Sequence, residues 1–153
     1  MIMLLIEKGK RRLTAFSSSG DVLLRCPVAL GKSPVGHKRA EGDGRTPEGD
    51  YFICLKRDTG RFGCALGVSY PSLADAKQAV QEGRLETSLL PLFEAAEKEQ
   101  KRPPWGTCLG GEIYIHGGGM ERDWTAGCVA LADADMQALY PMCQTGDAVR
   151  IIP

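Results

Sequence analysis

Short apolar runs bounded by turn residues fill the first part and the end of the chain. Runs of this kind, separated by glycine, proline, serine or aspartate, are typical of β-strands. The segments with this pattern are residues 1–6, 13–16, 22–26, 51–55, 64–70, 111–116 and 148–152. We therefore expect about seven strands.

Residues 71–102 have a helical pattern instead. Ser72 is followed three residues later by Asp75, which resembles a capping box at a helix start. Apolar residues then recur at helical spacing up to Gly83, and a second helix is expected over about 89–101, where Glu and Lys stand four residues apart. This helical insertion (about 71–102) either caps a functional groove or simply widens the fold.

Two further segments carry turn and cap signals. Residues 31–49 hold five glycines and two prolines, which predicts an ordered but irregular loop. Asp133 is placed to cap a short helix that ends near Tyr140. Together with the strands, these elements predict a mainly β domain with added helices.

Length and charge restrict the classes of protein to consider. The 153 residues correspond to one domain, residues 1–153. Nineteen basic and nineteen acidic residues cancel, so electrostatic binding to nucleic acid or to an acidic membrane surface is not expected. No apolar run approaches the roughly 18 residues of a membrane helix, so membrane insertion is not expected either.

The cysteines do not follow a metal or disulfide pattern. The chain has six cysteines and two histidines, and no two cysteines are spaced as C-x-x-C. A structural zinc site is therefore not expected, and most of the thiols are expected to be small buried side chains in a reducing setting.

One pair of residues combines a nucleophile with a base. His116 ends an expected strand, and Cys128 follows twelve residues later. An imidazole within hydrogen-bonding reach can remove the thiol proton, and the thiolate then attacks a carbonyl, which is acyl-transfer chemistry. Gly127 is expected to let the backbone turn sharply and to free N–H groups for a developing oxyanion. The spacing alone leaves open that Cys128 is simply a core residue.

The surrounding motifs resemble one known family. Residues 113–117 (IYIHG) and 123–131 (DWTAGCVAL) resemble the His-Gly and Ser/Thr-x-Gly-Cys signature of the L,D-transpeptidase catalytic domain, the YkuD family. Residues 41–51 resemble the family's Gly-Asp-x-x-Thr-Pro-x-Gly-x-Tyr segment, residues 31–32 the Gly-Lys that precedes it, and residues 146–151 its closing strand. The resemblance spans nearly the whole chain in the right order.

The resemblance implies an L,D-transpeptidase-like β-sandwich with a helical insertion and a short helix after the cysteine. It implies that Cys128 is the nucleophile, His116 the general base, and the backbone carbonyl of Gly117 the group that orients His116. Family enzymes attack the third residue of a peptidoglycan stem tetrapeptide, release the terminal D-alanine and pass the acyl group from a thioester to an amine. Peptidoglycan stem peptides are thus the implied partner, and no metal or organic cofactor is implied.

Two positions depart from the family pattern. Many members carry His between the Ser and the Gly, and Arg or Asn two residues after the Cys, where this chain has Ala126 and Ala130. Residues 123–128, Asp-Trp-Thr-x-Gly-Cys, resemble a sub-branch that includes amidase-type members. Hydrolysis at diaminopimelate bonds, by an amidase or L,D-carboxypeptidase, is therefore the close alternative. A non-catalytic wall-binding or redox-responsive module is a third interpretation.

Four further residues have candidate supporting roles, and a fifth, His37, is expected to have none. Thr125 is expected to hydrogen-bond the loop that presents the cysteine, and Trp124 is either a wall of the substrate groove or a core residue. Arg45 and Glu48 could pair with each other or touch a stem peptide. His37 is expected to be a solvated loop residue.

Two features of the chain indicate different locations. The family acts outside the cytoplasmic membrane, so the resemblance implies the cell envelope. The basic residues of this chain follow the first apolar run rather than precede it, so the chain as written shows no export signal. A cytoplasmic location therefore stays open.

Overall fold

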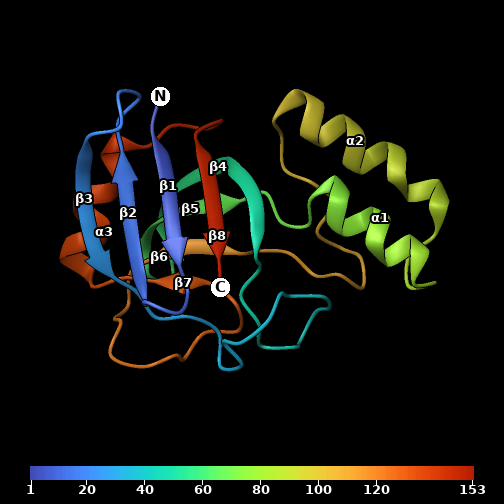
Figure 1. Cartoon of the computed structure of the whole chain (residues 1–153), viewed down its shortest axis with the longest axis horizontal. Coiled ribbons are helices and arrows are strands. Elements are labelled where there is room, and N and C mark those ends of the chain that lie inside the picture. Colours follow the sequence, from blue (N-terminus) through green and yellow to red (C-terminus); the bar gives the residue numbers. More distant parts are fainter.

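The strands form one curled sheet. The computed structural model describes residues 1–153. Eight strands lie in the order β3-β2-β1-β8-β4-β5-β6-β7 (Figure 1). Their bounds are β1 Met3–Glu7, β2 Arg12–Phe16, β3 Val22–Pro27, β4 Gly49–Gly60, β5 Gly63–Val68, β6 Tyr114–His116, β7 Val129–Ala130 and β8 Ala148–Ile152. The helices are α1 Leu73–Gln81, α2 Leu90–Glu99 and α3 Asp133–Leu139, with short 3-10 turns η1 Thr87–Leu89 and η2 Tyr140–Met142.

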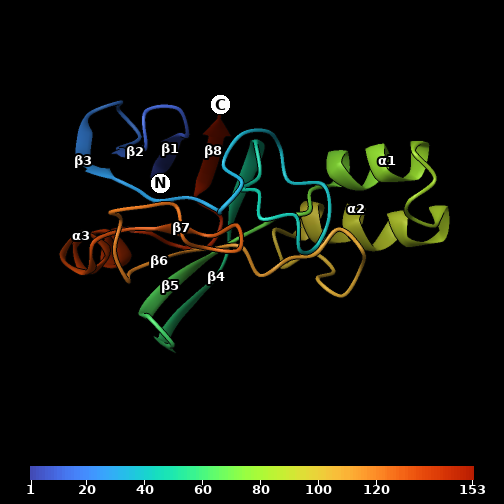
Figure 2. The ribbon, with the colours of Figure 1, turned by 90° about the horizontal axis from the view of Figure 1, so that it is seen from below.

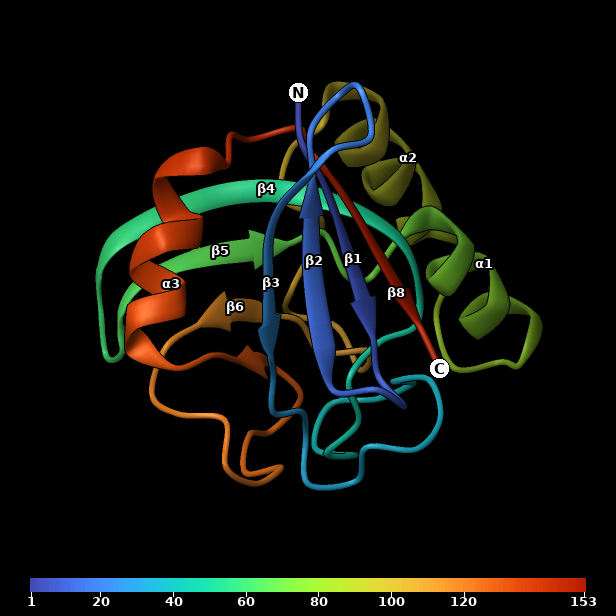
Figure 3. The same cartoon turned by 60° about the vertical axis from the view of Figure 1, so that its left-hand side comes forward.

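Strand β4 joins the two halves of the sheet. Residues 49–52 of β4 pair antiparallel with β8, and residues 53–60 pair antiparallel with β5. On one side, β8 runs parallel to β1, and β1 to β3 form an antiparallel meander. On the other side, β6 is antiparallel to β5 and parallel to β7. Figure 3 shows the β3-β2-β1-β8 half crossing in front of β4, β5 and β6, so the sheet curls until its two halves face each other.

The main core lies between these two halves. In β1, Leu4 and Ile6 are fully buried while their neighbours are not, and Val149 and Ile151 alternate with exposed neighbours in β8. This period of two is the pattern of strands with one buried face. A continuous hydrophobic cluster of 21 buried residues draws members from both halves and from α3.

Helices α1 and α2 form a separate layer beside the sheet. The capping box that starts α1 is present, because Ser72 Oγ accepts the Asp75 N–H at 3.1 Å and the Ser72 N–H donates to the Asp75 carboxylate at 2.9 Å. The pair packs around its own small cluster, formed by Ala76, Ala79, Phe93 and Leu109. In Figure 1 this pair and α3 lie at opposite ends of the molecule. No helix is both long and apolar enough to cross a membrane.

The mainly β fold with its helical insertion and its short helix after the cysteine is confirmed, with three local differences. Strand β7 has only two residues, which is too short to show alternation. Strand β4 continues to Gly60, through residues expected to form a loop, and a tight turn leads directly into β5. The expected cap of α3 is wrong: Ala132 holds the cap position, and the Asp133 carboxylate accepts the Gly118 N–H instead.

Candidate active site

Cys128 and His116 are brought together by two short parallel strands. In the β6–β7 pair, Ile115 lies opposite Val129 and His116 opposite Ala130, so Cys128 falls in register with Tyr114. Residues two apart on a strand share a face, which puts the side chains of His116 and Cys128 on the same face. Both line one pocket of about 180 Å³. The hairpin formed by β4 and β5 supplies most of the remaining wall.

The imidazole of His116 is buried and held in one tautomer. Its Nδ1 lies 2.5 Å from the Gly117 carbonyl oxygen, which can only accept, so Nδ1 carries the hydrogen and Nε2 has a free lone pair. The Phe62 ring stacks on the imidazole at 4.5 Å, and the Trp124 ring meets its edge at 5.7 Å. Burial lowers the pKa of His116, and the hydrogen bond to Gly117 only partly offsets this. The imidazole is therefore neutral at neutral pH and can accept a proton.

The thiol of Cys128 makes its hydrogen bonds to backbone groups and none to the imidazole. Its Sγ accepts the Tyr114 N–H at 3.3 Å, and its S–H donates to the Glu112 carbonyl at 3.5 Å. Burial raises the pKa of the Cys128 thiol, while the Tyr114 N–H and the charge of Lys38 act in the opposite direction. The pocket thus holds a neutral thiol beside a neutral base.

Thr125 fastens the loop that carries the cysteine. Its side chain is buried; the hydroxyl donates to the Cys128 carbonyl at 2.7 Å and accepts the Gly127 N–H at 3.1 Å. Gly127 has a φ of +146°, and a Cβ at this position would lie 2.7 Å from the Arg45 carbonyl oxygen. Only glycine fits there without a shift.

The two N–H groups at the turn before Sγ differ in their hydrogen bonding. The Gly127 N–H donates to Thr125 Oγ1 at 3.1 Å. The Cys128 N–H donates to no acceptor within the chain and is the donor that remains next to Sγ. The sharp turn at Gly127 therefore positions the next N–H along the chain.

Trp124 packs against His116 and does not line the pocket of Cys128. Its Nε1 donates to the Gly119 carbonyl at 2.9 Å, and its ring also packs edge-on against Phe62 at 5.2 Å. The side chain is half-buried, and its role as a wall of a substrate groove stays a prediction. It contacts the ring of His116 from outside the pocket.

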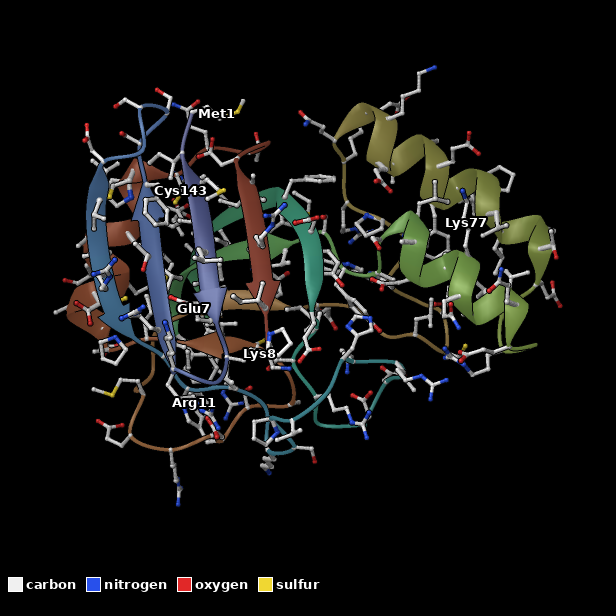
Figure 4. All side chains as sticks on the ribbon, in the orientation of Figure 1. Met1, Glu7, Lys8, Arg11, Lys77 and Cys143 are labelled. Atoms are coloured by element: carbon white, nitrogen blue, oxygen red, sulfur yellow. The ribbon has the colours of Figure 1, made fainter.

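Arg45 and Glu48 do not pair with each other and do not line the pocket. The buried ammonium of Lys8 forms an ion pair with the Glu48 carboxylate at 3.1 Å, because a buried cation needs an anionic partner. Lys8 also donates to the carbonyls of Gly36 and Thr46, at 2.9 and 2.7 Å. Figure 4 shows Lys8 just beyond the end of β1, beside the glycine-rich loop. Of the two alternatives, the pairing of Arg45 with Glu48 is wrong because the folded chain gives Glu48 another cation, and contact with a stem peptide stays a prediction.

His37 is likewise engaged rather than solvated. Its Nδ1 accepts the Glu48 N–H, and its Nε2–H donates to the Asp75 carboxylate, both at 2.8 Å. His37 therefore ties the glycine-rich loop to the first turn of α1.

The hairpin of β4 and β5 contributes residues that the sequence pattern did not identify. Arg57, Arg61 and Phe62 line the pocket, and Tyr114 joins them from β6. Nothing in the local pattern of these residues signals a site; the four are brought together by strand pairing. No residue of α1 or α2 lines the pocket, and in Figure 2 the hairpin projects away from both helices.

Comparison with solved structures finds several chains with a similar fold. The helical cell shape determining protein Pgp2 from Campylobacter jejuni superposes with a TM-score of 0.68 at 22% identity, over 98% of this chain and 46% of that one. Bd1075 from Bdellovibrio bacteriovorus superposes with a TM-score of 0.62 at 20% identity, over 99% of this chain and 47% of that one. L,D-transpeptidase 1 from Mycobacterium tuberculosis superposes with a TM-score of 0.55 at 13% identity, over 99% of this chain and 62% of that one. The chain spans about half the length of the first of these structures. At these identities the likeness shows the fold.

The sequence comparison identifies the family. No curated protein sequence matches the chain. The profile described as the L,D-transpeptidase catalytic domain (YkuD) matches residues 2–151, which is nearly the whole chain. The curled sheet agrees with solved L,D-transpeptidase structures. The chain therefore belongs to the L,D-transpeptidase catalytic domain family.

Proposed function

We propose that the chain is a cysteine-dependent L,D-transpeptidase that acts on peptidoglycan stem tetrapeptides through a thioester on Cys128. The observation that carries this proposal is the shared pocket of Cys128 and His116, in which Nδ1 is held by Gly117 and Nε2 stays free. A neutral base beside a neutral thiol supports general-base activation of the nucleophile at the moment of attack. The site of action that follows is the cell envelope, where stem peptides occur.

The first half of the reaction forms the thioester. The S–H turns from the Glu112 carbonyl toward Nε2 of His116, which takes its proton as sulfur attacks the donor carbonyl. The oxyanion that forms accepts a hydrogen bond from the Cys128 N–H. When the C–N bond breaks, the imidazolium returns the proton to the leaving amine of the terminal residue, and the acyl group stays on sulfur.

The second half transfers the acyl group. His116 removes a proton from the incoming amine, which attacks the thioester carbonyl, and the thiolate leaves and is reprotonated. The products are a new amide and the free thiol, so the enzyme is unchanged.

The charge of the pocket supports a donor that carries carboxylates. Arg57 and Arg61 are both on its wall, and no acidic side chain is. Neither arginine forms an ion pair, although five others in the chain do. Arg57 is steadied by a hydrogen bond to the Tyr114 hydroxyl at 3.1 Å. Free guanidinium groups bind carboxylates well, and stem peptides end in one.

Hydrolysis is the second candidate, by an amidase or L,D-carboxypeptidase. It is favoured because this chain has alanine at two positions, 126 and 130, where many family members carry polar side chains. Ala126 is exposed beside the cysteine loop and Ala130 is fully buried, so neither offers a hydrogen bond to an acceptor amine. The Asp-Trp-Thr-x-Gly-Cys motif of residues 123–128 resembles the sub-branch that includes amidase-type members, which also supports hydrolysis.

Two measurements test the proposal. The protein is incubated with a carbapenem and analysed by intact-mass spectrometry and peptide mapping, beside Cys128→Ala and the matched control Cys108→Ala, whose thiol is exposed and lies outside the pocket. We expect one adduct on Cys128 in the wild type and in the control, and none in Cys128→Ala; an adduct that persists in Cys128→Ala overturns the proposal. A stem tetrapeptide supplied with and without a competing amine then separates transfer from hydrolysis, because only a transpeptidase converts most of the donor into the aminolysis product.

A further inference from the structure

We propose that Asp133 is a positioning residue for His116 and acts through the peptide bond between Gly117 and Gly118; this inference rests on the proposed role of His116 as the base. The two hydrogen bonds of this peptide unit carry the proposal. Its carbonyl oxygen accepts from His116 Nδ1 at 2.5 Å, and its N–H donates to Asp133 Oδ1 at 2.9 Å. The C=O and N–H of a trans peptide point to opposite sides of one rigid plane. Imidazole, peptide and carboxylate therefore form a continuous chain of hydrogen bonds.

The carboxylate fixes a peptide plane that its own residues leave free to rotate. Glycines occupy three successive positions from 117 to 119, and Gly118 and Gly119 have φ values of +109° and +114°. Such residues impose little restraint on the orientation of the plane. Backbone bonds tie the turn on either side, from the Leu131 N–H to the His116 carbonyl and from the Gly119 N–H to the Leu131 carbonyl. The side-chain anchor of the plane itself is Asp133.

The same contact makes the Gly117 carbonyl a better acceptor. A carboxylate that accepts from an amide N–H polarises the amide, and hydrogen bonds in a chain strengthen one another. When His116 takes the thiol proton, the imidazolium is stabilised by this polarised carbonyl and by the negative charge behind it. Through the peptide, Asp133 thus stabilises the imidazolium as a directly bonded carboxylate does, but more weakly.

The place of Asp133 in the fold links it to the nucleophile. The segment that carries Cys128 continues through β7 to the first residue of α3, so strand pairing with β6 sets the positions of Cys128 and Asp133 together. The packing is close: a Cβ on Gly117 would lie 2.5 Å from Asp133 Oδ1. The charged side chain that shares the adjoining pocket with Asp133 is Arg61.

The chain offers a matched control for the test. Asp135 is also in the first turn of α3, so both aspartates can interact with the helix dipole, but Asp135 makes no hydrogen bond to the glycine turn. We would compare Asp133→Asn, Asp133→Ala and Asp135→Asn with the wild type. Asp133→Asn keeps an acceptor oxygen and nearly the same shape, so it protects the test if Asp133→Ala fails to fold.

The readouts are the pH dependence of Cys128 acylation by a carbapenem and the NMR signals of the His116 ring. We expect Asp133→Ala to lower the maximal acylation rate about tenfold, well short of the roughly 10⁴-fold loss for a directly bonded aspartate, with the half-saturating carbapenem concentration unchanged. The rate of Asp133→Asn should lie between those of Asp133→Ala and the wild type. The acid limb of its pH–rate profile should move to lower pH, because the imidazolium loses a nearby negative charge and is less stable. Asp135→Asn should match the wild type.

The possible failures can be told apart. Equal rates and equal pH profiles in the wild type and Asp133→Ala would overturn the inference while leaving the proposed function intact. So would a loss in Asp135→Asn as large as that in Asp133→Asn. If the wild type itself forms no Cys128 adduct, the proposed function fails, and the ring signals still decide the positioning role: the Nδ1 proton of His116 should exchange faster with water in both Asp133 variants, and an unchanged exchange rate refutes it.

Discussion

Replacing Thr125 by valine should weaken the whole nucleophile loop while leaving its packing almost unchanged. Valine keeps the branched shape but removes the hydroxyl, which donates to the Cys128 carbonyl at 2.7 Å and accepts the Gly127 N–H at 3.1 Å. Thr125 is only 4% exposed, so water does not replace these bonds. A buried polar group left without a partner costs about 1–3 kcal/mol.

For the two groups together we expect a loss of about 2–3 kcal/mol in the free energy of unfolding, since the carbonyl suffers less than the N–H. A small domain is stable by roughly 5–15 kcal/mol, so the variant should still fold. At about 2–4 °C per kcal/mol for this size, its Tm should fall by about 4–12 °C. Thermal unfolding followed by circular dichroism measures this directly.

The acylation rate should fall together with the stability, because the same two hydrogen bonds fix the loop that carries Sγ and the N–H of Cys128. We expect a carbapenem to acylate Thr125→Val at least tenfold more slowly than the wild type. Thr125→Ser keeps the hydroxyl and loses one methyl group, so it should retain most of the rate and lose about 1 kcal/mol of stability. A Thr125→Val protein that melts within 1 °C of the wild type (a threshold of roughly 0.3–0.5 kcal/mol) and reacts as fast would refute the reasoning.

Three further outcomes follow from the pocket. Phe62→Ala removes the ring stacked on His116 and admits water, so the pKa of His116, which burial lowers, should rise toward its ordinary value of 6.5; an NMR titration of the ring tests this, and an unchanged pKa contradicts it. Arg57→Ala and Arg61→Ala should each raise the half-saturating concentration of a stem tetrapeptide about tenfold but not that of its C-terminal amide; equal effects on both substrates would exclude carboxylate binding. Because burial raises the pKa of Cys128, its labelling by iodoacetamide should keep rising above pH 9 (its ordinary thiol pKa); a plateau near neutral pH would indicate a preformed thiolate instead.

Features set by neighbouring residues in the chain were predictable. The capping box of Ser72 and Asp75 forms as expected, because its two hydrogen bonds lie within one helical turn. The glycine before Cys128 adopts a positive φ, which short-range sterics reserve for glycine. The places of β1 and β8 were also predictable, because short apolar runs bounded by turn residues are typical of strands. The alternating burial in β1 was not, since residues 3–6 are all apolar.

Features that join distant segments were not predictable from the same pattern. Glu48 pairs with Lys8 rather than Arg45, and His37 reaches Asp75, because the folded chain brings those partners closer than the ones nearby in sequence. Asp133 resembles a helix cap locally, yet its carboxylate binds a turn fifteen residues earlier. Local rules of capping cannot anticipate a competing acceptor or donor from another strand.

The candidate site also combines residues that the sequence identifies with residues that only the fold brings there. Motifs single out Cys128 and His116, because nucleophile and base are recognisable residue types in a recognisable order. The walls of their pocket come from the hairpin of β4 and β5, whose arginines and phenylalanine follow no motif and reach the pocket only through strand pairing. Side-chain chemistry and short-range sterics are properties of the chain itself. The partners of Thr125, His116 and Asp133 exist only once the sheet has curled and the segments around β6 and β7 lie together, since these contacts depend on distances that no local stretch of the chain sets.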